Sequence, residues 1–221
     1  MIRVTAFAWV PPFAAGLVRD LRVRWALEEA GLTYQERLIG PGEQESAEHR
    51  SLQPFGQIPV YEEDDLVLFE SGAIVLHIAE RCETLLPGDP AERARAIQWV
   101  WAALNSMEPH IQNLALIDLF HAGEEWAKLR RPGALAFVEK RLDALSARLG
   151  GSQYLDDDRF TVGDLMMTTV LRILRHTDLI ERRPSLASYK ARCEARPAFQ
   201  KALADQLAPF GRNAPTAQAA G

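Results

Sequence analysis

The sequence predicts an α/β N-terminal domain, a mixed four-stranded sheet with helices, followed by an all-α C-terminal helical domain. Short apolar strands alternate with helical stripes over residues 1–83, whereas only helical patterns follow residue 90. Between these regions, the segment TLLPGDPAER at 84–93 contains two closely spaced prolines, which is typical of an interdomain linker. We therefore expect a first domain at 1–83, a linker at 84–89 and a helical domain at 90–210.

The composition is that of an ordinary globular protein, with 221 residues of which 48% are hydrophobic and 25% charged. The net charge of −5 argues against a general affinity for nucleic acid or anionic membranes. Cys82 and Cys193 have no metal-ligand spacing, so we expect two small buried side chains and no metal. The N-terminus lacks a signal-peptide pattern, and no apolar run approaches the ~20 residues that span a bilayer. We expect a cytoplasmic protein.

The first part of the N-terminal domain is predicted to be a strand, a helix and a second strand. Residues 2–8 (IRVTAFA) and 32–39 (LTYQERLI) are the two strands. The segment GLVRDLRVRWALEEAG at 16–31 predicts the helix, because an apolar residue recurs every four positions from Leu17 to Trp25. Two strands joined by a helix form a right-handed parallel crossover.

The second part of this domain adds a hairpin and a helix. A polar loop at 41–51, with a short helical turn, precedes two short strands, IPVYE at 58–62 and LVLF at 66–69. The acidic turn at 63–65 predicts that these strands form a hairpin. Apolar side chains then share one helical stripe over residues 71–83. The resulting order, β-α-β-(α)-β-β-α, is the one expected of a thioredoxin-like domain.

The rest of the chain carries helical patterns only. Asp89 and Pro90 suit the start of a helix, with aspartate as N-cap and proline at the first helical position. The small and polar residues 211–221 are predicted to be a disordered tail. The helices are predicted at 90–120, 131–149, 161–177 and roughly 185–205.

Thr161 and Asp164 have the spacing of a capping box, just before the apolar run LMMTTVL. In such a box the threonine hydroxyl and the carboxylate three residues later satisfy backbone N–H groups that a helix start leaves unpaired. We interpret this box as structural. Asp164→Ala should then cost on the order of 1 kcal/mol, more if the box is buried, and should reduce the folding yield rather than a rate constant.

Three motifs resemble those of a known family. In the first, Gly56-Gln57-Ile58-Pro59 places an apolar residue and a proline after a turn, and FESGAI at 69–74 opens a helix with Glu-Ser. The second is the capping-box segment FTVGD at 160–164, and the third is RVRWALEEAG at 22–31. With the two-domain organisation, these motifs resemble the cytosolic glutathione transferase family over nearly the whole chain. The resemblance implies that glutathione is a co-substrate.

The residues of the first motif suit the chemistry of glutathione, a peptide with two carboxylates, an amine and a thiol. If Pro59 is cis, the N–H and C=O of Ile58 point outward and can pair with the cysteinyl backbone. Ser71, at the start of a helix, suits the γ-glutamyl carboxylate, and Glu70 suits the ammonium group. Gln57 is expected to reach the ligand backbone. The alternative is that Pro59 only shapes a turn and Ser71 only caps a helix.

The group that activates the thiol is not evident. The family usually supplies Tyr, Ser or Cys after the first strand, but residues 7–20 contain none of these, and Val18-Arg19-Asp20 stands at the corresponding position. In one hypothesis, Arg19 acts as the catalytic residue, because a cation and a helix N-terminus both lower a thiol pKa. In a second, Asn105 or His110 reaches the sulfur. In a third, the protein binds glutathione or another ligand with little catalysis. The alternative for Arg19 itself is an exposed helix charge paired with Asp20 or Glu28.

A hydrophobic electrophile requires an apolar cleft, which we expect between the domains. For Trp101 and Met107 the alternative is plain helix core, and for His110 it is a structural role. The predicted contacts of the electrophile are Trp9, Val10, Phe13, Trp101, Met107 and His110.

The sequence therefore favours a glutathione transferase, in which the glutathione thiolate attacks a small hydrophobic electrophile. Glutathione-dependent isomerisation or dehalogenation is compatible with the same site. The alternatives are a non-catalytic glutathione-binding or hydrophobic-ligand-binding protein on the same fold, and a glutathione-dependent disulfide reductase. The resemblance also implies a homodimer, formed through residues 71–83 and 90–120.

Overall fold

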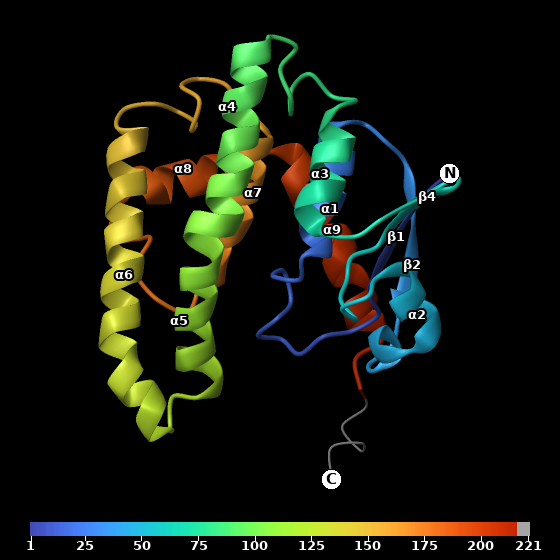
Figure 1. Cartoon of the computed structure of the whole chain (residues 1–221), viewed down its shortest axis with the longest axis horizontal. Coiled ribbons are helices and arrows are strands. Elements are labelled where there is room, and N and C mark those ends of the chain that lie inside the picture. The colour runs from blue at the N-terminus through green and yellow to red at the C-terminus, as the bar shows by residue number, and fades with distance from the viewer. Residues whose placement is uncertain (216–221) are drawn as a thin grey trace. The chain divides into compact units, whose positions relative to one another are not determined.

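The computed structural model describes residues 1–215, which form two compact units. The first unit consists of Met1–Cys82 together with the described residues from Pro197 onward, and the second is Glu83–Arg196 (Figure 1). The predicted tail at 211–221 begins inside a helix, because α9 (Pro197–Arg212) extends to Arg212. Residues 216–221 of that tail lie outside the described residues.

The first unit contains the predicted mixed four-stranded sheet, in the order β2-β1-β3-β4. Strands β1 (Ile2–Phe7) and β2 (Tyr34–Ile39) are parallel, with Ile2 opposite Tyr34. Strands β3 (Tyr61–Glu63) and β4 (Leu66–Leu68) form the hairpin, and β3 pairs antiparallel with β1. The crossover and the hairpin are therefore confirmed.

One helix of the first unit packs against two others. Helix α1 (Asp20–Glu29) buries Trp25 completely and contacts both α3 (Ser71–Ala79) and α9. It begins at Asp20, later than the predicted residue 16, because turns occupy residues 12–19 and Gly16 has a φ of +76°. The polar loop forms two short elements, η1 (Glu43–Glu45) and α2 (Ala47–Leu52).

Helix α9 groups with the first unit, whereas the sequence placed residues up to 210 in the helical domain. The Gln206 side chain donates to the Val18 carbonyl at 3.1 Å and to Asp20 Oδ1 at 2.6 Å. The Phe199 ring contacts Trp25 edge-on, with 4.8 Å between centroids. Periodicity shows that such a helix buries one face but does not show which unit that face covers.

The second unit is helical, as predicted. Its first predicted helix, 90–120, is α4 (Pro90–Trp101), a π-helical segment η2 (Ala102–Met107) and α5 (Glu108–Phe120) in succession. Pro109 has no N–H to donate back to the preceding turn, which accounts for the interrupted α-helical ladder. Then follow α6 (Glu125–Leu149), α7 (Val162–Leu171), η3 (Arg172–Leu174) and α8 (Pro184–Glu194).

The two predicted caps are present in this unit. The Asp89 carboxylate accepts from the N–H groups of Ala91 and Glu92, at 3.0 and 2.9 Å, on the surface. At α7, the Thr161 hydroxyl accepts from Gly163 N–H at 3.2 Å, and Asp164 Oδ2 accepts from Thr161 N–H at 2.8 Å. Both residues of this capping box are completely buried.

The two cysteines differ in burial. Cys193 is buried, which raises the pKa of its thiol to about 12 and keeps it protonated at neutral pH. Cys82 is only half-buried, unlike the prediction, and its Sγ lies 3.5 Å from the Glu29 carbonyl.

Candidate functional site

The first part of the candidate site is the loop that leads into β3. The Ile58–Pro59 peptide bond is cis, and the carbonyl of Val60, the residue after Pro59, accepts from Thr5 N–H of β1 at 2.9 Å. Over residues 1–215, neither the N–H nor the C=O of Ile58 has a hydrogen-bond partner. A backbone pair of this kind is available to an extended peptide ligand.

Two buried polar side chains hold this loop, and the sequence analysis missed both. Gln53 Oε1 accepts from Phe55 N–H at 2.6 Å and from Gln57 N–H at 3.2 Å. His49 Nε2 lies 2.7 Å from the Gln57 carbonyl oxygen. These contacts fix the backbone of Gln57, whose side chain is exposed, just before Ile58. In the sequence, the only indication of these two residues was a polar stretch without helical or strand periodicity.

Gly56→Ala is expected to destabilise this loop by more than Gly31→Ala destabilises the end of α1. Both glycines have a φ of +65°, which costs an alanine about 1–2 kcal/mol. A Cβ at Gly31 meets nothing within 4 Å, whereas one at Gly56 lies 3.2 Å from the Gln44 carbonyl oxygen. Urea unfolding of the two variants separates the steric cost from the conformational cost, and equal losses would contradict the prediction.

The second part of the site is the N-terminus of α3. Glu70 is its N-cap, with an exposed side chain and a φ of +67°, a conformation that is rare for a residue of this size and is often found at functional sites. In the described chain, the N–H groups of Ser71, Gly72 and Ala73 have no hydrogen-bond partner. With the positive end of the helix dipole, these donors form a site suited to an anion.

Arg22 of α1 is the third part of the site, and it was not singled out in the sequence. Its side chain is 3% exposed, and its Nη1 donates to Ser71 Oγ at 3.1 Å. Ser71 itself is 6% exposed. In the sequence Arg22 stands between two apolar residues, Leu21 and Val23, and the structure buries nearly all of its neighbours on the helix.

The loop between β1 and α1 carries the residue predicted to be catalytic. Arg19 is half-buried at the N-cap of α1, and none of residues 7–20 is a Ser, Thr, Tyr or Cys. Val10 is buried, Trp9 is half-buried and Phe13 is 50% exposed. Two turns shape the loop, with Ala14 N–H donating to the Pro11 carbonyl and Leu17 N–H to the Ala14 carbonyl.

A buried charged group fixes the first turn of α1 beneath this loop. Asp20 accepts from Arg24 Nε at 2.7 Å and from the Gln206 amide at 2.6 Å, and Arg24 also pairs with Glu36. Burial raises the pKa of Asp20, while Arg24 and Gln206 oppose that rise. Contacts between α1 and α9 therefore fix the backbone next to Arg19.

The remaining predicted contacts of the electrophile lie in the second unit. Trp101, at the end of α4, is 51% exposed, and Met107, at the end of η2, is 5% exposed. His110 is half-buried and contacts Phe137 of α6 with the two rings tilted by 42° and 4.2 Å between their centroids. Asn105 is exposed on η2.

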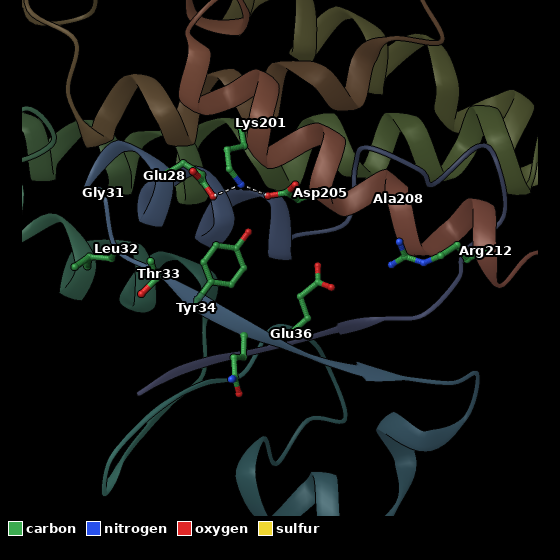
Figure 2. Close-up of a pocket in the computed structure, with 11 residues that line it drawn as sticks. Glu28, Gly31, Leu32, Thr33, Tyr34, Glu36, Lys201, Asp205, Ala208 and Arg212 are labelled. Atoms are coloured by element: carbon green, nitrogen blue, oxygen red, sulfur yellow. Dashed lines mark hydrogen bonds and ion pairs between the residues drawn. The ribbon is translucent and has the colours of Figure 1, made fainter.

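A polar groove of about 780 Å³ lies elsewhere in the first unit, between β2 and α9. Figure 2 shows Lys201 between Glu28 and Asp205, with which it forms ion pairs at 3.0 and 2.5 Å, and the Tyr34 hydroxyl directed toward this cluster. None of the residues predicted to contact glutathione or the electrophile lines the groove. The candidate site therefore does not coincide with it.

Two searches of the described residues, for metal ligands and for membrane-spanning helices, found neither. No group of three or more His, Cys, Asp or Glu side chains among residues 1–215 is arranged to hold a metal ion. None of the described helices combines the length and the apolar character that crossing a bilayer requires.

Comparisons with known proteins show sequence similarity over most of the chain. Residues 13–80 match the model of the glutathione S-transferase N-terminal domain, and residues 130–197 match that of the C-terminal domain. A glutathione S-transferase from Hyoscyamus muticus is 30% identical over 83% of this chain and 92% of its own. Glutathione S-transferase 4 from Zea mays is 29% identical over 97% of each chain.

Solved structures show the same fold. A glutathione transferase from Burkholderia graminis, with two glutathione molecules bound per subunit, superposes with a TM-score of 0.81. It is 27% identical, and the match covers 92% of this chain and 87% of the other. From the domain models, the Hyoscyamus relative and the shared fold, we conclude that the chain belongs to the glutathione S-transferase family.

Proposed function

We propose that this protein is a glutathione transferase that uses glutathione as co-substrate and joins its thiolate to a small hydrophobic electrophile. The observation that carries the proposal is the set of unpaired N–H groups at the start of α3, with the buried Ser71 hydroxyl beside them. Such a set of donors is suited to a carboxylate. The glutathione bound to the Burkholderia relative is a further support.

Each proposed contact of glutathione rests on a feature of the first unit. The unpaired backbone of Ile58, next to Pro59, suits the cysteinyl N–H and C=O. Ser71 and the α3 N-terminus suit the γ-glutamyl carboxylate, and the exposed carboxylate of Glu70 suits the ammonium group. The exposed side chain of Gln57 suits the ligand backbone.

Arg19 is proposed as the catalytic residue. It stands at the N-cap of α1, so the sulfur beside it would meet both a guanidinium and the positive end of a helix dipole. Both lower the pKa of a thiol, and the thiolate is the form that attacks an electrophile. Trp9, Val10 and Phe13 are proposed as apolar contacts of that electrophile. The same role of Trp101, Met107 and His110 stays a prediction from the sequence.

A homodimer and a cytoplasmic location complete the proposal. Phe55 is 64% exposed and Phe69 is 36% exposed, and their rings contact each other with centroids 6.2 Å apart. Exposed aromatic side chains of this kind are enriched at protein interfaces. We propose that the dimer uses α3 and α4, and sedimentation of the wild type against Phe55→Ser tests the contribution of this aromatic pair.

The thiol of bound glutathione is expected to ionise well below the pKa of the free peptide, and Arg19→Ala is expected to raise that pKa by roughly one unit. Absorbance near 240 nm against pH, with calorimetric binding in parallel, measures both effects. Arg3→Ala removes an exposed arginine of β1 and is the matched control, for which we expect no change. A thiol pKa that is lowered to the same value in wild type and Arg19→Ala would overturn the role of Arg19.

A non-catalytic glutathione-binding protein is the second candidate function. The observation that favours it is the absence of any hydroxyl or thiol side chain from residues 7–20. In this case glutathione binds with an unshifted thiol pKa, and no conjugate forms with an activated aryl halide. If glutathione does not bind at all, both candidate functions are wrong.

A further inference from the structure

The groove between β2 and α9 runs along a free edge of the sheet. Strand β2 stands at one end of the order β2-β1-β3-β4, so a neighbouring strand pairs with only one of its two edges. Six consecutive residues, 31–36, line the groove on this side, and side chains of α9 line the other. Figure 2 shows the Tyr34 and Glu36 side chains directed toward α9. An unpaired strand edge beside a groove of about 780 Å³ is a place where an extended chain can dock.

The register of the parallel pair shows which backbone groups face the free edge. Ala8 N–H, just after β1, donates to the Ile39 carbonyl at 2.8 Å. In a parallel pair, every second residue of a strand directs both its N–H and its C=O to the same neighbour. Ile39 faces β1, so the alternate residues Tyr34, Glu36 and Leu38 present their backbone groups to the free edge. Within residues 1–215, those groups have no hydrogen-bond partner.

The charged side chains of the groove are separated by sign. Lys201 pairs with both Glu28 and Asp205, at 3.0 and 2.5 Å, so that end has one negative charge in excess. The Tyr34 hydroxyl, buried and without a hydrogen-bond partner in the described chain, is directed toward the same cluster (Figure 2). Arg212 lines the groove further along α9, is exposed, and has no ion-pair partner among the described residues. One end of the groove therefore suits a cation and the other an anion.

The distance between the two ends is that of a short peptide. Lys201 and Arg212 are 11 positions apart on α9, which corresponds to about 16 Å. Two residues five positions apart in an extended chain are also about 16 Å apart. We infer that the groove is a second binding site, which takes a short extended peptide as a fifth strand beside β2. The peptide carries a basic residue at the Lys201 end and an acidic residue at the Arg212 end.

Binding is tested with the peptide acetyl-Lys-Thr-Val-Thr-Val-Glu-amide, whose charges match the two ends of the groove. Calorimetry on the full-length protein gives its dissociation constant with and without saturating glutathione, and we expect the two values to agree. NMR hydrogen exchange locates the bound peptide. The N–H groups of Tyr34 and Glu36 should exchange fast in the free protein and at least tenfold more slowly in the complex. The N–H of Ile58, in the candidate glutathione site, should not change.

Two modified forms of the peptide test the edge pairing. One carries N-methyl groups on its second and fourth residues, and the other on its third and fifth. An extended chain directs alternate N–H groups to the same side, so only one of the two sets can face β2. One form should therefore lose affinity roughly tenfold or more, while the other keeps it. Equal losses for the two forms would contradict pairing with the edge of β2.

Arg212→Glu is expected to weaken the peptide roughly fivefold or more, because it replaces attraction by repulsion. Arg130→Glu is the matched control, since Arg130 is an exposed arginine of α6 that has no ion-pair partner among the described residues. We expect it to leave the affinity unchanged within about twofold. A peptide with glutamine in place of glutamate should bind wild type more weakly, and it decides the matter if Arg212→Glu does not fold.

The inference does not depend on the proposed function, because the peptide measurements do not require glutathione to bind. Three results would overturn it. The first is the absence of peptide binding at millimolar concentration. The second is competition with glutathione, which would place the peptide in the candidate glutathione site. The third is protection of amide groups elsewhere in the protein while those of Tyr34 and Glu36 exchange as before.

Discussion

Asp164→Ala is expected to lower the free energy of unfolding by about 3–5 kcal/mol, well beyond the ~1 kcal/mol of an ordinary helix cap. The carboxylate is completely buried and accepts four donors. They come from the N–H groups of Leu155 and Thr161 and from the hydroxyls of Thr161 and Tyr189. Alanine leaves all of them unsatisfied in the core of the second unit, and each buried unsatisfied group costs about 1–3 kcal/mol.

Asp89→Ala is the matched control for this prediction. Asp89 also caps a helix of the second unit through two N–H groups, but at the surface, where water replaces the lost carboxylate. Urea unfolding should therefore show a loss of about 1 kcal/mol for Asp89→Ala. Equal losses for the two variants would show that burial adds nothing to the cap. Folding yield should fall for Asp164→Ala, while the turnover of the folded fraction stays unchanged.

Gly163→Ala is expected to destabilise the protein by about 2 kcal/mol or more, although alanine is the better helix former. A Cβ at this position would lie 2.4 Å from the Trp99 Cβ and 3.2 Å from the Ala96 carbonyl oxygen, both on α4. Neither atom belongs to the flexible end of a side chain. Helices α4 and α7 would therefore have to move apart along their contact.

Gly133→Ala, in the same unit, is expected to change the free energy of unfolding in the opposite direction. Gly133 lies inside α6, and a Cβ there meets nothing within 4 Å. The substitution should raise the free energy of unfolding by up to about 1 kcal/mol, because it reduces the entropy of the unfolded chain. Thermal unfolding of both variants then gives shifts of opposite sign. A stabilised Gly163→Ala would mean that α4 and α7 are not closely packed there.

Features that depend on nearby residues could be predicted from the sequence. Apolar periodicity gave the parallel crossover and the hairpin, and the spacing of Thr161 and Asp164 gave the capping box. The placement of α9 could not be predicted, because the contact of Gln206 with Asp20 joins residues 186 positions apart. Nothing local to residues 197–212 distinguishes a helix of one unit from a helix of the other.

In the candidate site, too, some residues could be predicted from short motifs and others could not. Gln57 to Pro59 and Glu70 to Ser71 are short motifs, and the Ile58–Pro59 bond, whose isomer the sequence left open, is cis. Arg22 and His49 were missed because each acts on a segment outside its own helix. The Arg22–Ser71 contact spans 49 positions, and the His49–Gln57 contact joins α2 to the loop beyond it. Their effect depends on tertiary contacts that carry no sequence pattern.

The contacts of α9 with α1 have a consequence for the order in which a ribosome delivers this protein. The second unit is continuous from Glu83 to Arg196, so all of its residues emerge before α9 does. The first unit, although it begins at Met1, lacks the contacts that α9 makes with Trp25 and Asp20 until residues 199 and 206 have been translated. At about 5–20 residues per second, this delay lasts several seconds or more. Synthesis of the first unit therefore begins before that of the second unit, but the first unit is completed last.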